Sequence, residues 1–350
     1  MSRSRSLKLL PPIGPEAQPL DAVAVLEPMI LLYEFVKTLQ QNINQVGGLG
    51  TRGSWLHTLR EALLRLQMAQ SSQDKLEILV ETLLSEGCAQ KRLVDLYDQT
   101  VQRSQSVGSL DVPWLATNGR LKFCFWGDGI YPEEWKNFDD SPLAFSYLGE
   151  PLWNRRQGIS VVGSREPHVL SQQWLKTELR NFIADRKAAG FYTISGGARG
   201  VDQWAHKISL LTGVPTLAIL PSGLWRPYPD SMRILADEIL QEGGCLLSEY
   251  ALIQEMRKFH FRERNRLISS LGAATLVVEA QTKSGSLMTG HLALEQGRPL
   301  YVVPGHPSLS AFGGSLELLR MGAACAASSE DLLNFWRCDA SELKSLCSLP

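Results

Sequence analysis

From Ile159 onward, short apolar runs alternate with longer amphipathic stretches, and this alternation is the feature that most constrains the fold. The apolar runs are rich in β-branched residues, have the length of strands, and begin at Ile159, Phe191, Thr216, Cys245, Thr275 and Leu300. The amphipathic stretches between them have helical length and cover 170–189, 201–212, 230–242, 262–271 and 286–296. Apolar strands separated by helices are typical of a parallel sheet covered on both faces. The sequence therefore predicts an α/β domain.

Most of the expected strands end in a small or chemically special residue. These strand ends are Gly163, Ser195, Pro221, Glu279-Ala280 and Pro304-Gly305. Ligands of open α/β sheets bind at the carboxyl ends of the strands. The turns at these positions are therefore the first place to look for a site.

A different pattern precedes the alternation. Residues 1–20 carry four prolines and few large apolar side chains, which predicts a flexible leader. Over 21–105, apolar residues recur at spacings of three and four, which is typical of amphipathic helices. We expect a small all-α N-terminal domain there, an α/β domain over 120–335, and a C-terminal tail over 336–350.

Composition narrows the class of protein. The 350 residues include 35 basic and 36 acidic side chains, and a net charge of −1 argues against a wholly basic protein that coats nucleic acid. The six cysteines form no CxxC pair, so neither a zinc site nor a disulfide framework is expected. No apolar run has the length of a signal peptide or a membrane span, which predicts a soluble, cytoplasmic protein. We expect no metal, no cofactor and no membrane contact.

The first turn at the predicted sheet edge reads Gly163-Ser164-Arg165. A glycine directly after a strand lets the backbone turn tightly, and Arg165 would then project over the edge. No GxGxxG pattern follows, so this is not a dinucleotide-binding fingerprint. Taken alone, the turn favours the plain alternative of a strand–helix connection with a solvated arginine.

The second turn, from Ser195 to Gly200, is a stronger anion-binding signal. Its three glycines precede a helix and leave backbone N–H groups free to approach an anion. Arg199 adds a guanidinium that can bind a phosphate through two hydrogen bonds. Asp202 is placed to cap or start the following helix. The sequence favours an anion site over a tight turn, with candidate residues Ser195, Gly196, Gly197 and Arg199.

The third element is the stretch Arg257–Arg266, which carries five basic side chains interleaved with Phe259, His260 and Phe261. Phosphate neutralisation needs lysine or arginine, and base stacking needs aromatic faces. The stretch therefore predicts nucleic-acid contacts from Arg262, Arg264, Asn265 and Arg266. The alternative is a solvated, charged helix start, and carboxylates elsewhere in the fold could neutralise part of the cluster.

The fourth element places Ser-Gly-Ser between a strand and a helix, again presenting amides and hydroxyls to a phosphate. Its candidate residues are Lys283, Ser284, Gly285, Ser286 and Thr289. His291 and Glu295 follow at helical spacing, but the absence of a third ligand favours packing over metal binding.

Taken together and in this order, the motifs resemble those of the DprA/Smf family, the DNA-processing proteins of bacterial transformation. The resemblance covers about 120–335 and is carried by Gly163-Ser164-Arg165, Ser195–Asp202, Tyr228-Pro229, Leu247–Tyr250, Arg264-Asn265-Arg266, Val278-Glu279-Ala280, Ser284–Leu287, Glu295–Arg298 and Val303-Pro304-Gly305.

This resemblance implies an extended Rossmann-like domain that binds single-stranded DNA, forms a homodimer, and helps to load RecA on incoming strands during transformation and recombination. It implies that the DNA pocket is lined by Arg165, Gly196, Gly197 and Arg199. It also implies a binding protein rather than an enzyme, with no catalytic residue.

Two other interpretations remain at this point. The sheet also resembles nucleotide-sugar hydrolases of the LOG group, with Thr289 and Glu295 at the corresponding loop, although the Pro-Gly-Gly of that group is absent. A module that senses a small nucleotide would use the same pocket. The charge of Arg257–Arg266 argues for a longer anion than one nucleotide.

Overall fold

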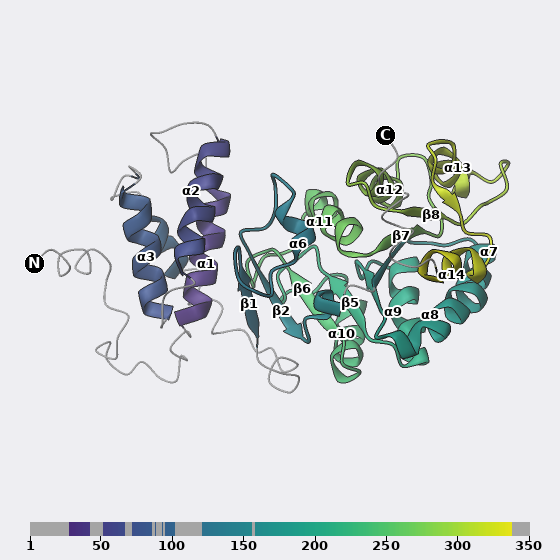
Figure 1. The fold of residues 1–350 in the computed structure, drawn as a ribbon, viewed down its shortest axis with the longest axis horizontal. Coiled ribbons are helices and arrows are strands. Elements are labelled where there is room, and N and C mark those ends of the chain that lie inside the picture. The colour runs from purple at the N-terminus through teal and green to yellow at the C-terminus, as the bar shows by residue number, and fades with distance from the viewer. Residues whose placement is uncertain are drawn as a thin grey trace, which may run out of the picture.

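The computed structural model describes residues 28–42, 52–66, 72–85, 88, 93, 95–101, 121–155 and 158–337. The expected leader and residues 338–350 of the expected tail lie outside these residues. Within them, nine strands form one sheet, with helices on both of its faces and a helical layer beside one edge (Figure 1).

Three amphipathic helices precede the sheet, as the sequence predicts. They are α1 (Pro28–Gln41), α2 (Arg52–Arg65) and α3 (Ser72–Ser85), and residues 95–101 are also helical. Their apolar faces are buried against one another, because residues three and four apart share one side of a helix. The expected boundaries of the helical and α/β domains stay a prediction, since residues 102–120 lie outside the described part of the chain.

The strands of the sheet run in the order β1-β2-β6-β5-β4-β3-β7-β8-β9. Their bounds are β1 (Lys122–Phe125), β2 (Ala144–Gly149), β3 (Gly158–Val162), β4 (Tyr192–Ser195), β5 (Thr216–Ile219), β6 (Cys245–Ser248), β7 (Ala274–Val277), β8 (Leu300–Val302) and β9 (Ala324–Cys325). The strands β3 to β8 are the expected apolar runs, and every pairing among them is parallel. The Rossmann-like α/β class is confirmed.

Two strands extend this parallel sheet in a way that the sequence pattern did not reveal. β2 pairs with β6 and with β1, both antiparallel, so the complete sheet is mixed. β1 has only four residues, and β2 lies next to a strand about 100 residues later in the chain. Strands this short carry little periodicity, and their pairing depends on contacts remote in sequence.

Helices cover both faces of the sheet (Figure 1). One face carries α7 (Val169–Trp174), α8 (Arg180–Arg186), α9 (Val201–Thr212), α10 (Ser231–Gln241) and α14 (Ser329–Arg337). The other carries α6 (Glu133–Lys136), α11 (Lys258–Leu271), α12 (Gly285–Glu295) and α13 (Gly313–Arg320). α7 and α8 are joined by a π-helical turn, Leu175–Leu179.

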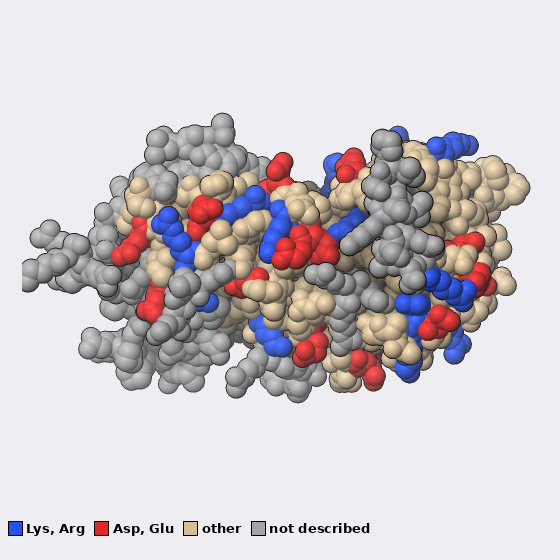
Figure 2. All heavy atoms as spheres, viewed as in Figure 1, with Lys and Arg blue, Asp and Glu red and all other residues tan. Residues whose placement is uncertain are grey.

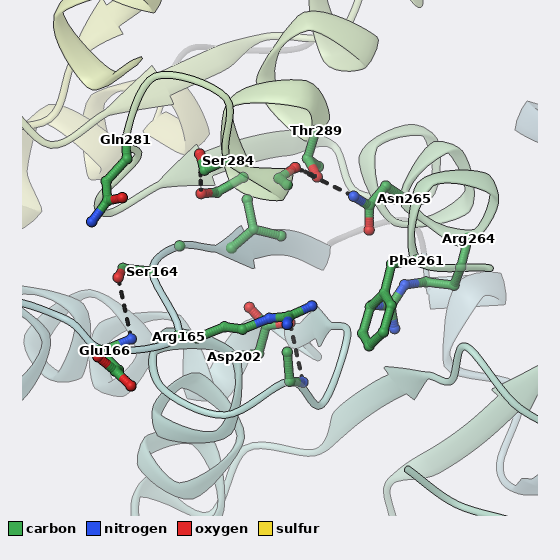
Figure 3. Close-up of a pocket in the computed structure, with 15 residues that line it drawn as sticks. Ser164, Arg165, Glu166, Asp202, Phe261, Arg264, Asn265, Gln281, Ser284 and Thr289 are labelled. Atoms are coloured by element: carbon green, nitrogen blue, oxygen red, sulfur yellow. Dashed lines mark hydrogen bonds between the residues drawn. The ribbon is translucent and has the colours of Figure 1, made fainter. Parts of the chain in front are cut away.

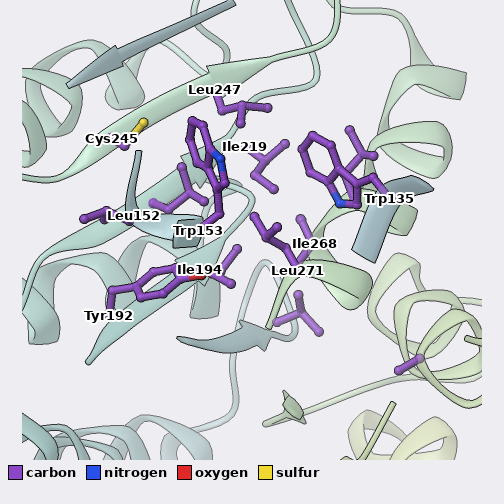
Figure 4. Packing of buried hydrophobic residues seen from close by; sticks show 14 of the residues in the cluster. Trp135, Leu152, Trp153, Tyr192, Ile194, Ile219, Cys245, Leu247, Ile268 and Leu271 are labelled. Carbon is purple, nitrogen blue, oxygen red and sulfur yellow. The ribbon is translucent and has the colours of Figure 1, made fainter. Parts of the chain in front are cut away.

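Neighbouring residues of the central strands belong to different hydrophobic clusters, one on each face of the sheet. Val161 packs beneath α9, whereas Val162 joins the cluster beneath α11 and α12. This alternation follows from strand geometry, in which successive side chains point to opposite faces. Figure 4 shows the second cluster, where Trp135 and Trp153 pack beside the strand side chains. Large aromatic side chains of this kind contribute much of the apolar area that stabilises a core.

The N-terminal helices pack against the edge formed by β1 and β2. Phe125 and Ala144 belong to the same hydrophobic cluster as the apolar faces of α1, α2 and α3. On α1, the Tyr33 hydroxyl donates to the carbonyl of Tyr250 at 2.8 Å, and Glu34 Oε1 accepts from the N–H of Leu252 at 2.8 Å. Helix α1 is therefore attached to the segment that leads from β6 into α11.

The topology determines where a site can form. From β3 the chain proceeds outward through β4, β5 and β6, whereas β7, β8 and β9 lie on the opposite side of β3. The connections at the carboxyl ends of β3 and β7 therefore leave in opposite directions. A crevice forms at such a reversal of strand order, and it is the usual ligand position in open α/β sheets.

Candidate functional site

A cavity of about 330 Å³ lies at the reversal between β3 and β7. Its volume is at the lower end for small-molecule sites. Four segments meet around it: the β3–α7 turn, the start of α9, the first half of α11, and the β7–α12 turn (Figure 3). The lining residues are Val162, Gly163, Ser164, Arg165, Glu166, Ala198, Asp202, Phe261, Arg264, Asn265, Gln281, Ser284, Gly285, Ser286 and Thr289.

The β3–α7 turn supplies the exposed cation of the cavity. A Cβ atom at Gly163 would stand 2.6 Å from Val201 Cγ2, so a side chain is excluded where the turn crosses the start of α9. Arg165 extends toward Phe261, with its guanidinium carbon 4.6 Å from the centre of the ring (Figure 3). This is a cation–π distance, and the contact holds an arginine over the cavity without neutralising its charge.

Glu279 fixes the far end of this turn. Its side chain is fully buried, and Oε2 accepts hydrogen bonds from the N–H of His168 at 2.8 Å and from Ser171 Oγ at 2.6 Å. A carboxylate at a helix N-terminus is stabilised by the free amides there. Glu279 thereby connects the end of β7 to the start of α7, where the turn with Arg165 ends.

The β4–α9 turn is compact because two of its residues meet other parts of the protein. Ser195 is buried and donates to the carbonyl of Val161 at 2.6 Å. The carbonyl of Gly196 accepts from Arg264 Nη1 at 2.6 Å, and a Cβ atom here would stand 2.5 Å from that guanidinium. Of this turn and the helix after it, Ala198 and Asp202 line the cavity. Ser195 and Gly196 therefore shape the cavity from behind.

Arg264 lies at the back of the cavity and is 2% exposed. Nη1 also donates to the carbonyl of Ile219. Burial lowers the pKa of Arg264 from its usual 12.5 to about 10, although the charge of Asp202 opposes this shift. Burial raises the pKa of Asp202 from 3.8 to about 6, against the effect of Arg264 and the amide of Ala198. The charge of each group thus affects the pKa of the other.

The opposite wall is the N-terminus of α12. Ser284 caps this helix, its Oγ accepting from the N–H of Leu287 at 3.1 Å. Asn265 Nδ2 donates to the carbonyl of Gly285 at 3.3 Å, and Thr289 Oγ1 donates to the same oxygen at 3.0 Å. The positive end of the helix dipole thus faces the cavity across from Arg165, an arrangement that attracts an anion.

The structure brings nine of the expected site residues together in the cavity wall. These are Gly163, Ser164, Arg165, Arg264, Asn265, Ser284, Gly285, Ser286 and Thr289. Six further lining residues were not among the expected site residues: Val162, Glu166, Ala198, Asp202, Phe261 and Gln281. Asp202 and Phe261 lie in motifs that the sequence had marked, so the signal for them was present.

The other expected residues do not line the cavity. Gly197 is buried close to Met232, and Arg199, Arg262 and Lys283 are exposed. Arg266 bonds carboxylates instead, with Nη2 2.7 Å from Glu249 Oε2 and Nε 2.9 Å from Asp140 Oδ2. Whether these residues contact DNA stays a prediction.

Several other features bear on the class of site. The described residues contain no group of histidine, cysteine and carboxylate side chains that could hold a metal ion. His291 Nε2 lies 3.5 Å from Glu317 Oε1, so it faces α13. None of the described helices is long and apolar enough to cross a membrane. Acidic and basic side chains are interspersed on the face seen in Figure 2.

Comparison with known proteins gives consistent matches. The chain is 34% identical over 219 residues to Protein Smf of Escherichia coli, covering 61% of this chain and 58% of that protein. It is 34% identical over 203 residues to DNA processing protein DprA of Bacillus subtilis, covering 58% of this chain and 67% of that one. The chain thus spans between about half and two thirds of these curated relatives.

Two solved structures agree with the fold. DprA of Streptococcus pneumoniae matches with a TM-score of 0.64 and 25% identity, over 87% of this chain and 96% of that one. This coverage extends into the N-terminal helices. DNA processing protein A of Helicobacter pylori, studied for its single-stranded DNA binding mode, matches with a TM-score of 0.55 and 26% identity, over 65% and 97%. Residues 122–337 match the family model of DNA recombination-mediator protein A, and the chain belongs to that family.

Proposed function

We propose that this protein binds single-stranded DNA in the cavity between β3 and β7. The observation that carries the proposal is the position of Arg165, an exposed guanidinium that stacks on Phe261 opposite the N-terminus of α12. A phosphate between them would meet a positive charge on one side and a helix dipole on the other. An aromatic ring among cations, as Phe261 is beside Arg165, is typical of single-strand binding sites.

The relatives support the choice of ligand. The Helicobacter pylori protein with the same fold is described by its single-stranded DNA binding mode. We extend the proposal to a role in transformation and recombination in which the protein protects incoming strands and helps to load RecA. The protein would act in the cytoplasm as a homodimer. Light scattering tests the dimer, and the rate of RecA filament formation on coated DNA tests the loading.

The alternative is hydrolysis of a nucleoside monophosphate, as in the LOG group. That chemistry would need Glu295 at the reacting bond. Glu295 is the last residue of α12, whose N-terminus lines the cavity, and a helix of 11 residues is about 16 Å long. Glu295 is exposed and outside the cavity wall, so the geometry favours binding over this reaction.

Fluorescence anisotropy with labelled single- and double-stranded oligonucleotides at two salt concentrations tests the proposal. We expect tighter binding to single strands and affinity that falls steeply with salt. Arg165→Ala should weaken binding by about tenfold to a hundredfold, since a hydrogen bond to a charged group contributes about 1.5–3 kcal/mol. Arg180→Ala is the matched control, because Arg180 is an exposed arginine on α8, away from the cavity.

Equal affinity of the folded Arg165→Ala and Arg180→Ala variants would refute the assignment of the cavity. No binding by the folded parent protein at low salt would refute the DNA proposal as a whole. In that case, release of free base from nucleoside monophosphates, and its loss in Glu295→Gln, would support the hydrolase.

A further inference from the structure

The first turn of α11 carries an aromatic ring on the protein surface. Phe259 is 49% exposed, and it lies two residues before Phe261 in the cavity wall. At about 1.5 Å of rise per residue, both rings belong to the same turn of helix. Phe259 itself does not line the cavity, so the proposed function leaves it without a role.

The ring of Phe259 rests against a fixed support. It meets the ring of His260 edge to face, with 4.6 Å between ring centres. His260 is buried, stacks on Tyr250 at 4.1 Å, and lies 3.0 Å from the carbonyl of Pro221 through Nδ1. A surface ring that is held in place loses little conformational entropy when a second ring stacks on its free face. Phe259 is therefore suited to be a stacking platform.

Cations surround this platform. Arg257, Lys258 and Arg262 are all exposed on the same turn, and none forms an ion pair within the described part of the chain. Of the nearby carboxylates, Glu263 lies 3.2 Å from the Tyr250 hydroxyl and Glu255 is exposed. Three cations against two carboxylates leave the turn with positive charge.

We infer that the first turn of α11 is a second contact surface for single-stranded DNA, on which Phe259 stacks with a base while its flanking cations contact phosphates. The inference rests on the proposed function, because the strand would reach Phe259 from the cavity past Phe261. Exposed aromatic faces interleaved with Lys and Arg suit a single strand, whose bases are unpaired and whose backbone is charged. A purely apolar protein partner would contact the ring of Phe259 but would have no use for the three cations beside it.

Oligothymidylates of two lengths separate this surface from the cavity. The short one is a dinucleotide, chosen because the cavity has a volume of about 330 Å³, and the long one, about 16 nucleotides, extends beyond it. We expect Phe259→Ala in the full chain to weaken binding of the long strand about tenfold and of the short strand less than twofold. Phe259→Tyr should restore the parent affinity, because it restores the ring.

Leu211→Ala is the matched control, since Leu211 is an exposed apolar side chain (79%) on α9. Circular dichroism establishes that each variant is folded. A second measurement is the salt dependence, in which Lys258→Ala should reduce the slope for the long strand by about one.

Three results would overturn the inference while leaving the proposed function intact. They are a long-strand affinity in Phe259→Ala equal to that of Leu211→Ala, an equal loss for both lengths, and a failure of tyrosine to restore binding. An equal loss would place the effect in the cavity. No binding of either strand by the parent would overturn the proposed function and this inference together.

Discussion

Replacing Arg264 with methionine tests whether this arginine stabilises the cavity rather than contacting DNA alone. Arg264 is almost fully buried, and its Nη1 donates to the carbonyls of Gly196 and Ile219. Methionine fills part of the same volume but donates no hydrogen bond. The substitution leaves two buried carbonyls without this donor and removes the positive charge that is coupled to Asp202.

The expected cost follows from these losses. Each buried acceptor left unpaired costs about 1–3 kcal/mol. Removing the charge of Arg264 also leaves Asp202 buried without the cation that favours its ionised form. We expect the free energy of unfolding to fall by about 3–5 kcal/mol in Arg264→Met. Arg262→Met, on the exposed side of the same helix, should change it by less than about 0.5 kcal/mol.

Urea unfolding followed by circular dichroism and tryptophan fluorescence measures the difference, with the slope m compared between variants. A double-mutant cycle with Asp202→Asn adds a direct test of the coupling. The double variant should cost less than the sum of the single variants, by at least about 1 kcal/mol. A loss below about 1 kcal/mol in Arg264→Met, or additive costs in the cycle, would refute this account of Arg264.

Two further predictions concern Asp202 and the N-terminal helices. Because the pKa of Asp202 is raised to about 6 in the folded protein, its carboxyl favours folding most below about pH 3.8, and this contribution is lost as pH rises through about 6. Affinity for oligothymidylate should rise as pH falls from about 7.5 to 5.5, because Asp202 in the cavity wall then becomes neutral. The rise should be absent in Asp202→Asn, and a rise of equal size in the parent and the variant would contradict the assignment. Glu34→Ala should lower the free energy of unfolding by about 1–3 kcal/mol, because Glu34 accepts from the buried N–H of Leu252. The control Glu61→Ala alters an exposed glutamate of α2, and equal stability of the two variants in urea would contradict the prediction.

The parallel part of the fold was predictable because its strands are buried on both faces. Residues such as Ile159, Val161 and Val162 form an apolar run that marks a strand by itself. β1 and β2 escaped prediction, since β1 has four residues and β2 depends on pairing with β6, about 100 residues later. Long-range pairing of this kind leaves no local period in the sequence.

The residues of the site also divide into those that local sequence patterns indicated and those whose roles depend on contacts remote in sequence. The sequence placed the turns with Arg165 and Ser284 at the same edge of the sheet, and both line the cavity, although the Arg165 turn taken alone favoured a plain connection. The roles of the three arginines of α11 were not predictable. The sequence does not distinguish these arginines, yet Arg262 is exposed, Arg264 is buried at the back of the cavity, and Arg266 is paired with carboxylates.

The sequence by itself determined the class of fold and the edge of the sheet at which the cavity lies, and it predicted anion binding by the turns there. These follow from local patterns of apolar, small and charged residues, which act over a few positions along the chain. Only the tertiary structure decided which cation faces the cavity. That choice depends on Phe261 beside Arg165, on Glu249 and Asp140 beside Arg266, and on the carbonyls around Arg264. Charges act through space at a few ångströms, and these partners are brought together only by folding.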